Sequence, residues 1–143
     1  MTCAVTYGKR MENGLEKNVT EKYLVDALSF TEAEARIIEE IQPFISGEFK
    51  VSGINRAHYS EVFLSNDSSA DKFYKIRINY ITLDEKTGTE KRTIAKMLVQ
   101  AGSFEDALSN FEKGMRGTLA DYEIIEISET PIVDVFEYEA KED

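Results

Sequence analysis

The sequence LVDALSFTEAEA at residues 24–35 decides the fold, because it reads as the end of a strand, a turn and the start of a helix. A second version, LVQAGSFEDALS, occupies residues 98–109. The shared Leu, Val, Ala, Ser and Phe keep a constant offset of 74 residues, from 24 to 98 and from 29 to 103. Two copies of one strand–helix unit indicate an internal duplication.

The similarity continues beyond the helix. Residues 49–54 align with 122–127, and residues 61–63 align with 134–136, at an offset of 73. Chance similarity between two amphipathic strand–helix–strand units is the alternative explanation. The near-constant offset of the Ser-Phe and Val-Phe pairs favours duplication.

Each copy is expected to begin with a hairpin. Alternating patterns predict strands over 3–11 and 17–27 in the first copy, and over 73–83 and 91–101 in the second. Asn13-Gly14 suits a tight turn, and Gly88 is the residue expected to adopt a positive φ in the second hairpin.

Each hairpin is followed by a helix and two further strands. Ser29 and Ser103 are the predicted N-caps. We expect two buried helical stripes, one formed by Phe30, Ala33, Ile37, Ile41 and Phe44 and the other by Phe104, Ala107, Leu108, Phe111 and Met115. The remaining strands are predicted over 48–54 and 59–64, and over 122–128 and 132–138.

The predicted fold class is therefore α+β, with two ββαββ repeats that form mainly antiparallel sheet with two packed helices. We expect residues 1–143 to form a single domain built of two repeats, 1–64 and 72–138. A polar linker joins them at 65–71, and a charged tail follows at 139–143. The pattern leaves open whether there is one continuous sheet or two.

Composition narrows the functional classes. The 143 residues are 42% hydrophobic and 31% charged, with a formal net charge of −10, which indicates a globular protein unsuited to nonspecific binding of nucleic acid or anionic membrane. One Cys and one His exclude an intramolecular disulfide and a Cys/His zinc site. We expect no metal, no cofactor, no membrane span and no signal peptide, and hence a cytoplasmic location.

The first candidate site is the segment where the two copies differ most, which contains Arg56, His58 and Tyr59. A titrating His beside an Arg and a Tyr suits anion binding or proton transfer at a ligand cleft. The simpler interpretation, which we favour, is a bend between strands whose polar side chains face solvent.

The second candidate site is a basic face on the second hairpin. If Gly88 closes a short turn, Arg77 lies opposite Lys96, and Lys75 and Arg92 lie on the same face. Like charges directly opposite each other require negative charge nearby. That charge is expected from acidic residues of a neighbouring strand; an acidic partner or a phosphate backbone is the alternative.

No phosphate-binding loop, dinucleotide fingerprint, nucleophile elbow or zinc-protease motif is present. The sequence therefore favours a non-enzymatic binding or adaptor domain of unknown ligand and partner, with a homodimer as one expected form. Nucleic-acid binding through Lys75, Arg77, Arg92 and Lys96 is one alternative. A small-ligand protein or enzyme with a cleft near His58 is the other.

Four stretches carry a family resemblance: YLVDALSFTEAEA at 23–35, ISGEF at 45–49, SEVF at 60–63 and ADYE at 120–123. They resemble a small bacterial family of uncharacterised proteins, a domain of unknown function, over nearly the whole chain. The resemblance implies a bacterial protein. It implies no activity, ligand or catalytic residue.

Overall fold

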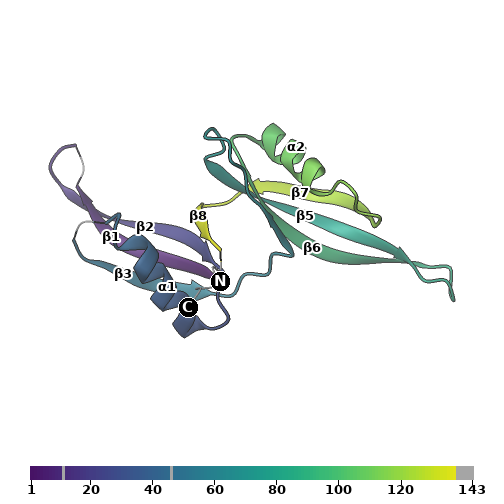
Figure 1. Ribbon diagram of the computed structural model, residues 1–143, viewed down its shortest axis with the longest axis horizontal. Helices are drawn as coiled ribbons and strands as arrows, with labels where there is room; N and C mark the ends of the chain where they lie inside the picture. Colours follow the sequence, from purple (N-terminus) through teal and green to yellow (C-terminus); the bar gives the residue numbers. More distant parts are fainter. Residues whose placement is uncertain (11, 46, 138–143) are drawn as a thin grey trace, which may run out of the picture. The chain divides into compact units, whose positions relative to one another are not determined.

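The structure is a computed structural model that describes residues 1–10, 12–45 and 47–137. Two helices and two mainly antiparallel four-stranded sheets confirm the α+β class. The chain divides into two compact units (Figure 1). Unit 1 comprises Met1–Ala57 and the chain from Pro131 onward, and unit 2 comprises His58–Thr130.

Unit 1 is a sheet with one helix. Its strands are β1 (Thr2–Arg10), β2 (Glu16–Val25), β3 (Phe49–Asn55) and β8 (Ile132–Phe136), in the order β3-β1-β2-β8. Helix α1 (Phe30–Ile41) covers one face. Its buried side chains pack with those of β1 and β2, and this core contains Cys3, Val5, Tyr23, Val25, Ala33, Ile37 and Ile41.

Unit 2 repeats this arrangement. Its strands are β4 (Glu61–Phe63), β5 (Lys72–Leu83), β6 (Glu90–Ala101) and β7 (Asp121–Glu129), in the order β4-β6-β5-β7. Helix α2 (Phe104–Gly114) packs over the sheet. The main core cluster contains Ile76, Ile78, Ala95, Met97, Val99, Phe111 and Met115.

The strand registers of the two units also correspond. In unit 1, Ala4 pairs with Gly53 and Val5 with Val51, so Ser52 is an extra residue in β3. In unit 2, Arg77 pairs with Glu126 and Ile78 with Ile124, so Ile125 is the extra residue in β7. Each unit therefore has a β-bulge at the same position of its outer strand.

The last strand of each sequence repeat joins the sheet that contains the first two strands of the other repeat. β4 follows β3 in the chain but is parallel to β6, with Glu61 opposite Met97. β8 follows β7 but is parallel to β2, with Asp134 opposite Tyr23. The compact units thus do not coincide with the sequence repeats 1–64 and 72–138. The single domain built of these repeats stays a prediction, and the expected tail at 139–143 lies outside the described residues.

Both helices begin as predicted. The Ser29 Oγ accepts a hydrogen bond from the Glu32 amide (3.1 Å), and the Ser103 Oγ accepts one from the Asp106 amide (3.2 Å). The Glu32 carboxylate also accepts from the Leu28 amide (3.0 Å). The bonds to Ser29 and Ser103 satisfy amides that the first helical turn leaves without partners, and the bond from Leu28 ties down the residue before the N-cap.

Three of the four predicted aromatic members of the helical stripes are exposed rather than buried, and only Phe111 is buried as predicted. Phe30 is 45% exposed, Phe104 is 53% exposed and Phe44 is 82% exposed. Side chains tilt toward the helix N-terminus, so a Phe in the first helical position projects past the packed turns. Phe30 lies under the Arg56 guanidinium instead, and Phe104 lies against the Tyr74 ring.

Three predicted strands are shorter than expected, and the one predicted over 132–138 ends at Phe136. The strand predicted over 17–27 ends at Val25, and the strand predicted over 59–64 contains only Glu61–Phe63. The shortening of β4 matters most, because β4 lies beside β6, which has 12 residues. Among the described residues, most of that edge of β6 therefore has no neighbouring strand.

Candidate functional site

The β5–β6 hairpin dominates unit 2. Its two strands pair without irregularity from Lys72 opposite Ala101 to Leu83 opposite Glu90. Gly88 in the connecting turn has a φ of 71°, which confirms the predicted turn residue. The register also confirms that Arg77 lies opposite Lys96.

The basic side chains lie on the sheet face away from α2. Residues paired directly across strands share a face, and Ile76 and Met97 belong to the opposite face that packs on the helix. The other face combines Lys75 and Arg77 of β5, Arg92 and Lys96 of β6, and Glu123 and Glu126 of β7. We call these six residues the charged face.

Two acidic residues of β7 form ion pairs with three of the four cations of the charged face. Glu126 forms ion pairs with Lys75 (3.7 Å) and Arg77 (3.5 Å). Glu123 accepts a hydrogen bond from Arg92 Nε (3.0 Å). A neighbouring acidic strand therefore supplies the negative charge that the hairpin requires, as the sequence led us to expect.

Hydrogen bonding also stabilises the ionised form of Glu123. Asn79 and Arg92 both donate to its carboxylate, and these bonds lower the pKa of Glu123 below its ordinary value of 4.5. By contrast, Lys96 has no ion pair with any residue that the structure describes. Lys96 thus differs from the other three cations of the charged face, each of which has an ion pair.

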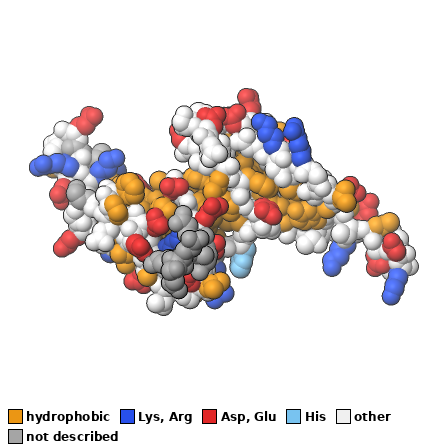
Figure 2. Space-filling view, viewed as in Figure 1, with side chains coloured by type: hydrophobic (Ala, Val, Ile, Leu, Met, Phe, Trp, Pro, Cys, Tyr) orange, Lys and Arg blue, Asp and Glu red, His pale blue; other side chains and the backbone are white. Residues whose placement is uncertain are grey.

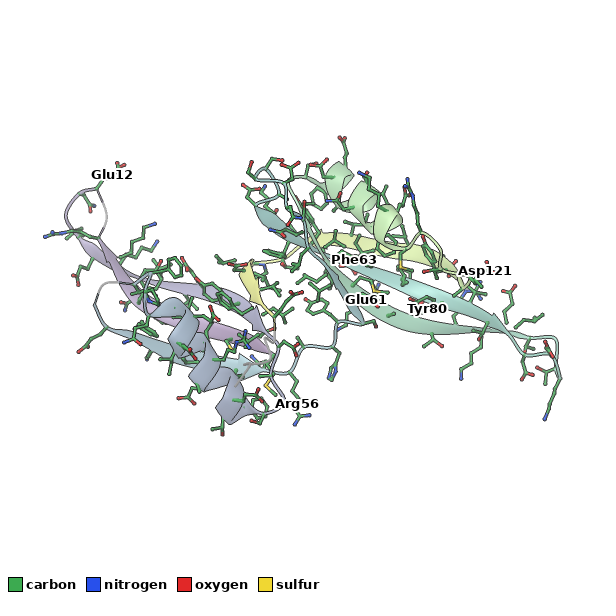
Figure 3. The ribbon with its side chains drawn as sticks, in the orientation of Figure 1. Glu12, Arg56, Glu61, Phe63, Tyr80 and Asp121 are labelled. Atoms are coloured by element: carbon green, nitrogen blue, oxygen red, sulfur yellow. The ribbon has the colours of Figure 1, made fainter. Side chains whose placement is uncertain are left out.

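The hairpin continues beyond the strands that flank it. β7 pairs with β5 only between Tyr74 and Ile81, and β4 pairs with β6 only at 97–99. In Figure 3, Tyr80 and Asp121 mark the region where β7 begins, and the hairpin extends past it. Figure 2 shows charged side chains of both signs at the tip of this hairpin.

Backbone geometry shows which N–H and C=O groups of β6 point away from β5. The Lys96 carbonyl accepts from the Ser60 amide (2.7 Å) on the β4 side, whereas the Thr89 carbonyl accepts from Asp84 on the β5 side. Successive residues of a strand direct their backbone groups to alternate sides. Glu90, Arg92 and Ile94 therefore direct their N–H and C=O groups toward solvent.

The side chains along this edge are exposed as well. Residues 90–94 are all exposed, and Ile94 is 65% exposed although it lies in a regular strand. We define the open edge as the stretch Glu90–Ile94. An unpaired regular strand with an exposed aliphatic side chain is a template for another strand.

Unlike the edge of β6, the outer strands β3 and β7 are protected against pairing with a further strand. β7 and β3 each contain a bulge, at Ile125 and Ser52, which interrupts the regular edge. β7 also has acidic residues along its length, including Glu123 and Glu126. β6 pairs without a bulge, so its open edge lacks this protection.

Sequence reasoning missed the open edge. The available signal was the difference in length between the strand expected over 59–64 and the strand expected over 91–101. That signal became useful only when the structure showed that these two strands are neighbours and that β4 has three residues.

The residues of the first candidate site fall on both sides of the boundary between the units. Arg56 belongs to unit 1, where its guanidinium lies 5.4 Å from the centroid of the Phe30 ring. His58 and Tyr59 belong to unit 2. His58 is exposed, and burial raises the pKa of the Tyr59 hydroxyl. No hydrogen bond or ion pair joins these three side chains within the described chain.

Unit 2 also contains a shallow cavity of about 430 Å³ between β4 and the end of α2. Phe63 and Gly114 meet in its wall, where a Cβ on residue 114 would lie 2.7 Å from the Phe63 ring. Lys113 and Asn110 contribute its polar groups. Ser65 also lines it, and the Ser65 Oγ accepts a hydrogen bond from the Asp67 amide (3.1 Å).

Metal-binding clusters and membrane-spanning helices are both absent from the described residues. Within those ranges, no group of three or more His, Cys, Asp or Glu side chains could hold a metal ion. No described helix is long and apolar enough to cross a membrane. Burial raises the pKa of the Cys3 thiol, which disfavours the reactive thiolate.

Comparison with known proteins adds a family. The model of a family described as a domain of unknown function, DUF4494, matches residues 1–138. The chain belongs to the DUF4494 family. This match confirms the expected membership of an uncharacterised family, while the bacterial origin stays a prediction. Comparisons of this DUF4494 chain with curated proteins and with solved structures gave no match.

Proposed function

We propose that this DUF4494 protein is a non-enzymatic, cytoplasmic binding or adaptor domain that takes up an extended protein segment along the open edge. The observation that supports this function is the unpaired, bulge-free edge of β6 at Glu90–Ile94, with Ile94 exposed.

Strand addition explains how such an edge binds. The backbone groups of Glu90, Arg92 and Ile94 offer donors and acceptors in the spacing that an extended segment requires. In this mode of recognition, main-chain hydrogen bonds supply affinity and alternate side chains supply specificity. Ile94 provides an apolar contact, and Arg92 and Lys96, two residues away on either side and on the same face of the sheet, provide positive charge beside it.

The alternatives have weaker support. Nucleic acid would have to compete with Glu123 and Glu126 for the cations of the charged face. A ligand cleft near His58 would require Arg56, His58 and Tyr59 to converge, and no hydrogen bond or ion pair joins their side chains within the described residues. Strand addition requires no rearrangement of the groups it uses.

The test uses synthetic extended peptides of about eight residues, one alternating Val and Glu and one alternating Val and Lys. We expect the acidic peptide to shift the amide NMR signals of Arg92 and Ile94, and the basic peptide to bind more weakly. Ile94→Pro removes an edge donor while leaving the β5–β6 hydrogen bonds intact, because Ile94 directs its N–H away from β5.

A matched substitution separates backbone from side chain. Ile94→Thr keeps the amide and a β-branched side chain, so it should retain the amide shifts that Ile94→Pro abolishes. Binding of both peptides that is unaffected by Ile94→Pro, or no binding of either peptide, contradicts the proposed function.

A further inference from the structure

We propose that the cavity between β4 and the end of α2 binds a small organic monocarboxylate with an apolar body, such as an aryl-substituted acetate. This site goes beyond the proposed function, because its lining residues are separate from the open edge. Three features carry the inference: an apolar wall from β4, the close approach of that wall to α2 at Gly114, and the cation Lys113.

The wall on the β4 side is apolar. Val62 and Phe63 of β4, and Leu64 directly after it, line the cavity of about 430 Å³. Val62 and Phe63 are half-buried, and Leu64 is 45% exposed. The Phe63 ring (Figure 3) contacts the buried Phe111 ring edge-on, with 6.2 Å between the centroids. Small-molecule sites combine apolar walls of this kind with a few polar groups, so the wall suits an aromatic or branched aliphatic group.

Gly114 lets the wall approach the helix. A Cβ at this position would lie 2.7 Å from the Phe63 ring, which is closer than packed side chains come. The ring therefore packs against bare helix backbone in the last turn of α2. Glycine lowers the stability of a helix relative to alanine, and at residue 114 it keeps one wall of the cavity in place.

The equivalent positions of unit 1 hold charged side chains that have partners. At the offset of 74 residues, Glu40 stands where unit 2 has Gly114, and Arg36 stands where it has Asn110. Arg36 forms an ion pair with Glu40 (3.8 Å) and donates to the Glu137 carbonyl. Unit 2 therefore carries a glycine and an amide in place of an ion pair, at the position where its cavity lies.

Lys113 supplies positive charge to the cavity. It is exposed in the last turn of α2 and has no ion pair with any residue in the described part of the chain. The other polar groups have protein partners, since Asn110 donates to the Gln100 carbonyl (3.0 Å) and the Ser65 Oγ accepts from the Asp67 amide (3.1 Å). No Asp or Glu is among the described residues that line the cavity. A cation beside an apolar wall selects an anion that carries an apolar group.

The same surroundings favour a single negative charge over a phosphate group. Phosphate sites usually combine several cations or a helix N-terminus. Here the helix presents its C-terminal turn, which carries partial negative charge, and one lysine lines the cavity among the described residues. A monocarboxylate therefore matches the site better than a phosphate ester does.

Phenylacetate is the probe, added to the full-length chain and followed through amide NMR signals. We expect saturable shifts at Ser65 and Gly114, with a dissociation constant on the order of 1 mM for a ligand of this size. Phenylacetamide keeps the ring and lacks the charge, so it should bind about fivefold more weakly. Acetate keeps the charge and lacks the ring, so it should not shift these signals.

Matched substitutions test the two walls separately. Lys113→Gln should raise the dissociation constant of phenylacetate about fivefold, whereas Lys86→Gln, which removes an exposed cation from the hairpin turn, should leave it unchanged. Gly114→Ala should weaken binding about tenfold, because the added Cβ forces the Phe63 ring to move. Ser109→Ala, at an exposed position of the same helix, is its control.

Each outcome decides the inference. No shift at Ser65 and Gly114 up to about 10 mM phenylacetate, or shifts only elsewhere, overturns the site. Equal affinity for phenylacetamide, or equal losses in Lys113→Gln and Lys86→Gln, overturns the carboxylate preference and the inference with it. If Gly114→Ala does not give a folded spectrum, the two lysine variants decide. The peptide titrations of the open edge follow other signals, so the proposed function stands or falls independently of this site.

Discussion

Phe104 and Phe111 show how strongly the position of a residue on a helix determines its role. Both are members of the apolar stripe that the sequence predicts on α2. Phe111 is fully buried and packs edge-on against Phe63 and Tyr122, whereas Phe104 is 53% exposed. The pattern of apolar residues identifies the stripe but does not show which end of it reaches the core.

This difference predicts unequal stability losses from the same substitution. Phe111→Ala should lower the free energy of unfolding by about 3–5 kcal/mol, because it leaves a cavity in the core. Phe104→Ala should cost about 1 kcal/mol, since it removes chiefly one ring contact with Tyr74. Urea denaturation of both variants measures the difference. Equal losses would contradict the burial described for α2.

At the scale of elements, a polar cluster on the charged face connects three strands. Glu123 on β7 accepts from Asn79 on β5 and from Arg92 on β6. The acidic strand thereby balances the basic hairpin within the sheet. The sequence predicted that acidic residues of a neighbouring strand supply this charge, but the pairing of β7 with β5 came from the structure.

Glu123 therefore predicts a pH-dependent contribution to stability. Its pKa is lowered in the folded state, so the contribution is present above the ordinary value of 4.5 and is lost as the pH falls through the folded pKa. We expect wild type to be more stable than Glu123→Gln at pH 7, and the difference to shrink below about pH 4.5. Urea denaturation of both proteins over that range measures it.

Glu105→Gln is the matched control for this titration. Glu105 lies exposed in the first turn of α2, away from the charged face. Glu105 accepts no hydrogen bond from Asn79 or Arg92, so Glu105→Gln measures the effect on the free energy of unfolding of removing a carboxylate outside the Glu123 cluster. A Glu123→Gln difference that persists undiminished at pH 2 would show that the substitution acts through packing rather than charge.

At the scale of the whole molecule, the exchange of β4 and β8 is the feature that most distinguishes the structure from its sequence repeats. Unit 2 is continuous in the chain, from His58 to Thr130. Unit 1 needs β8, which the chain supplies from beyond Pro131. Unit 2 is therefore built from one continuous segment of the chain, whereas unit 1 needs two separate segments.

Fragments test this asymmetry. A fragment of residues 58–130 contains all four strands of its sheet and α2, so we expect it to unfold cooperatively on its own. A fragment of residues 1–64 lacks β8, which leaves the β8 side of β2 without a partner strand at 22–25, and it should be less stable or aggregate. Circular dichroism during heating compares them. Equal stability would contradict a need for β8 in unit 1.

The sequence by itself determined the local structure. Alternating side chains, turn residues and the Ser caps specify two ββαββ element orders and the register of the long hairpin, because these depend on residues close in the chain. The tertiary structure alone decided that β4 and β8 change sheets, which aromatic side chains are buried, and that Glu90–Ile94 is left unpaired. Each of these depends on long-range pairing, in which the neighbour of a strand is chosen by the whole fold rather than by its own sequence.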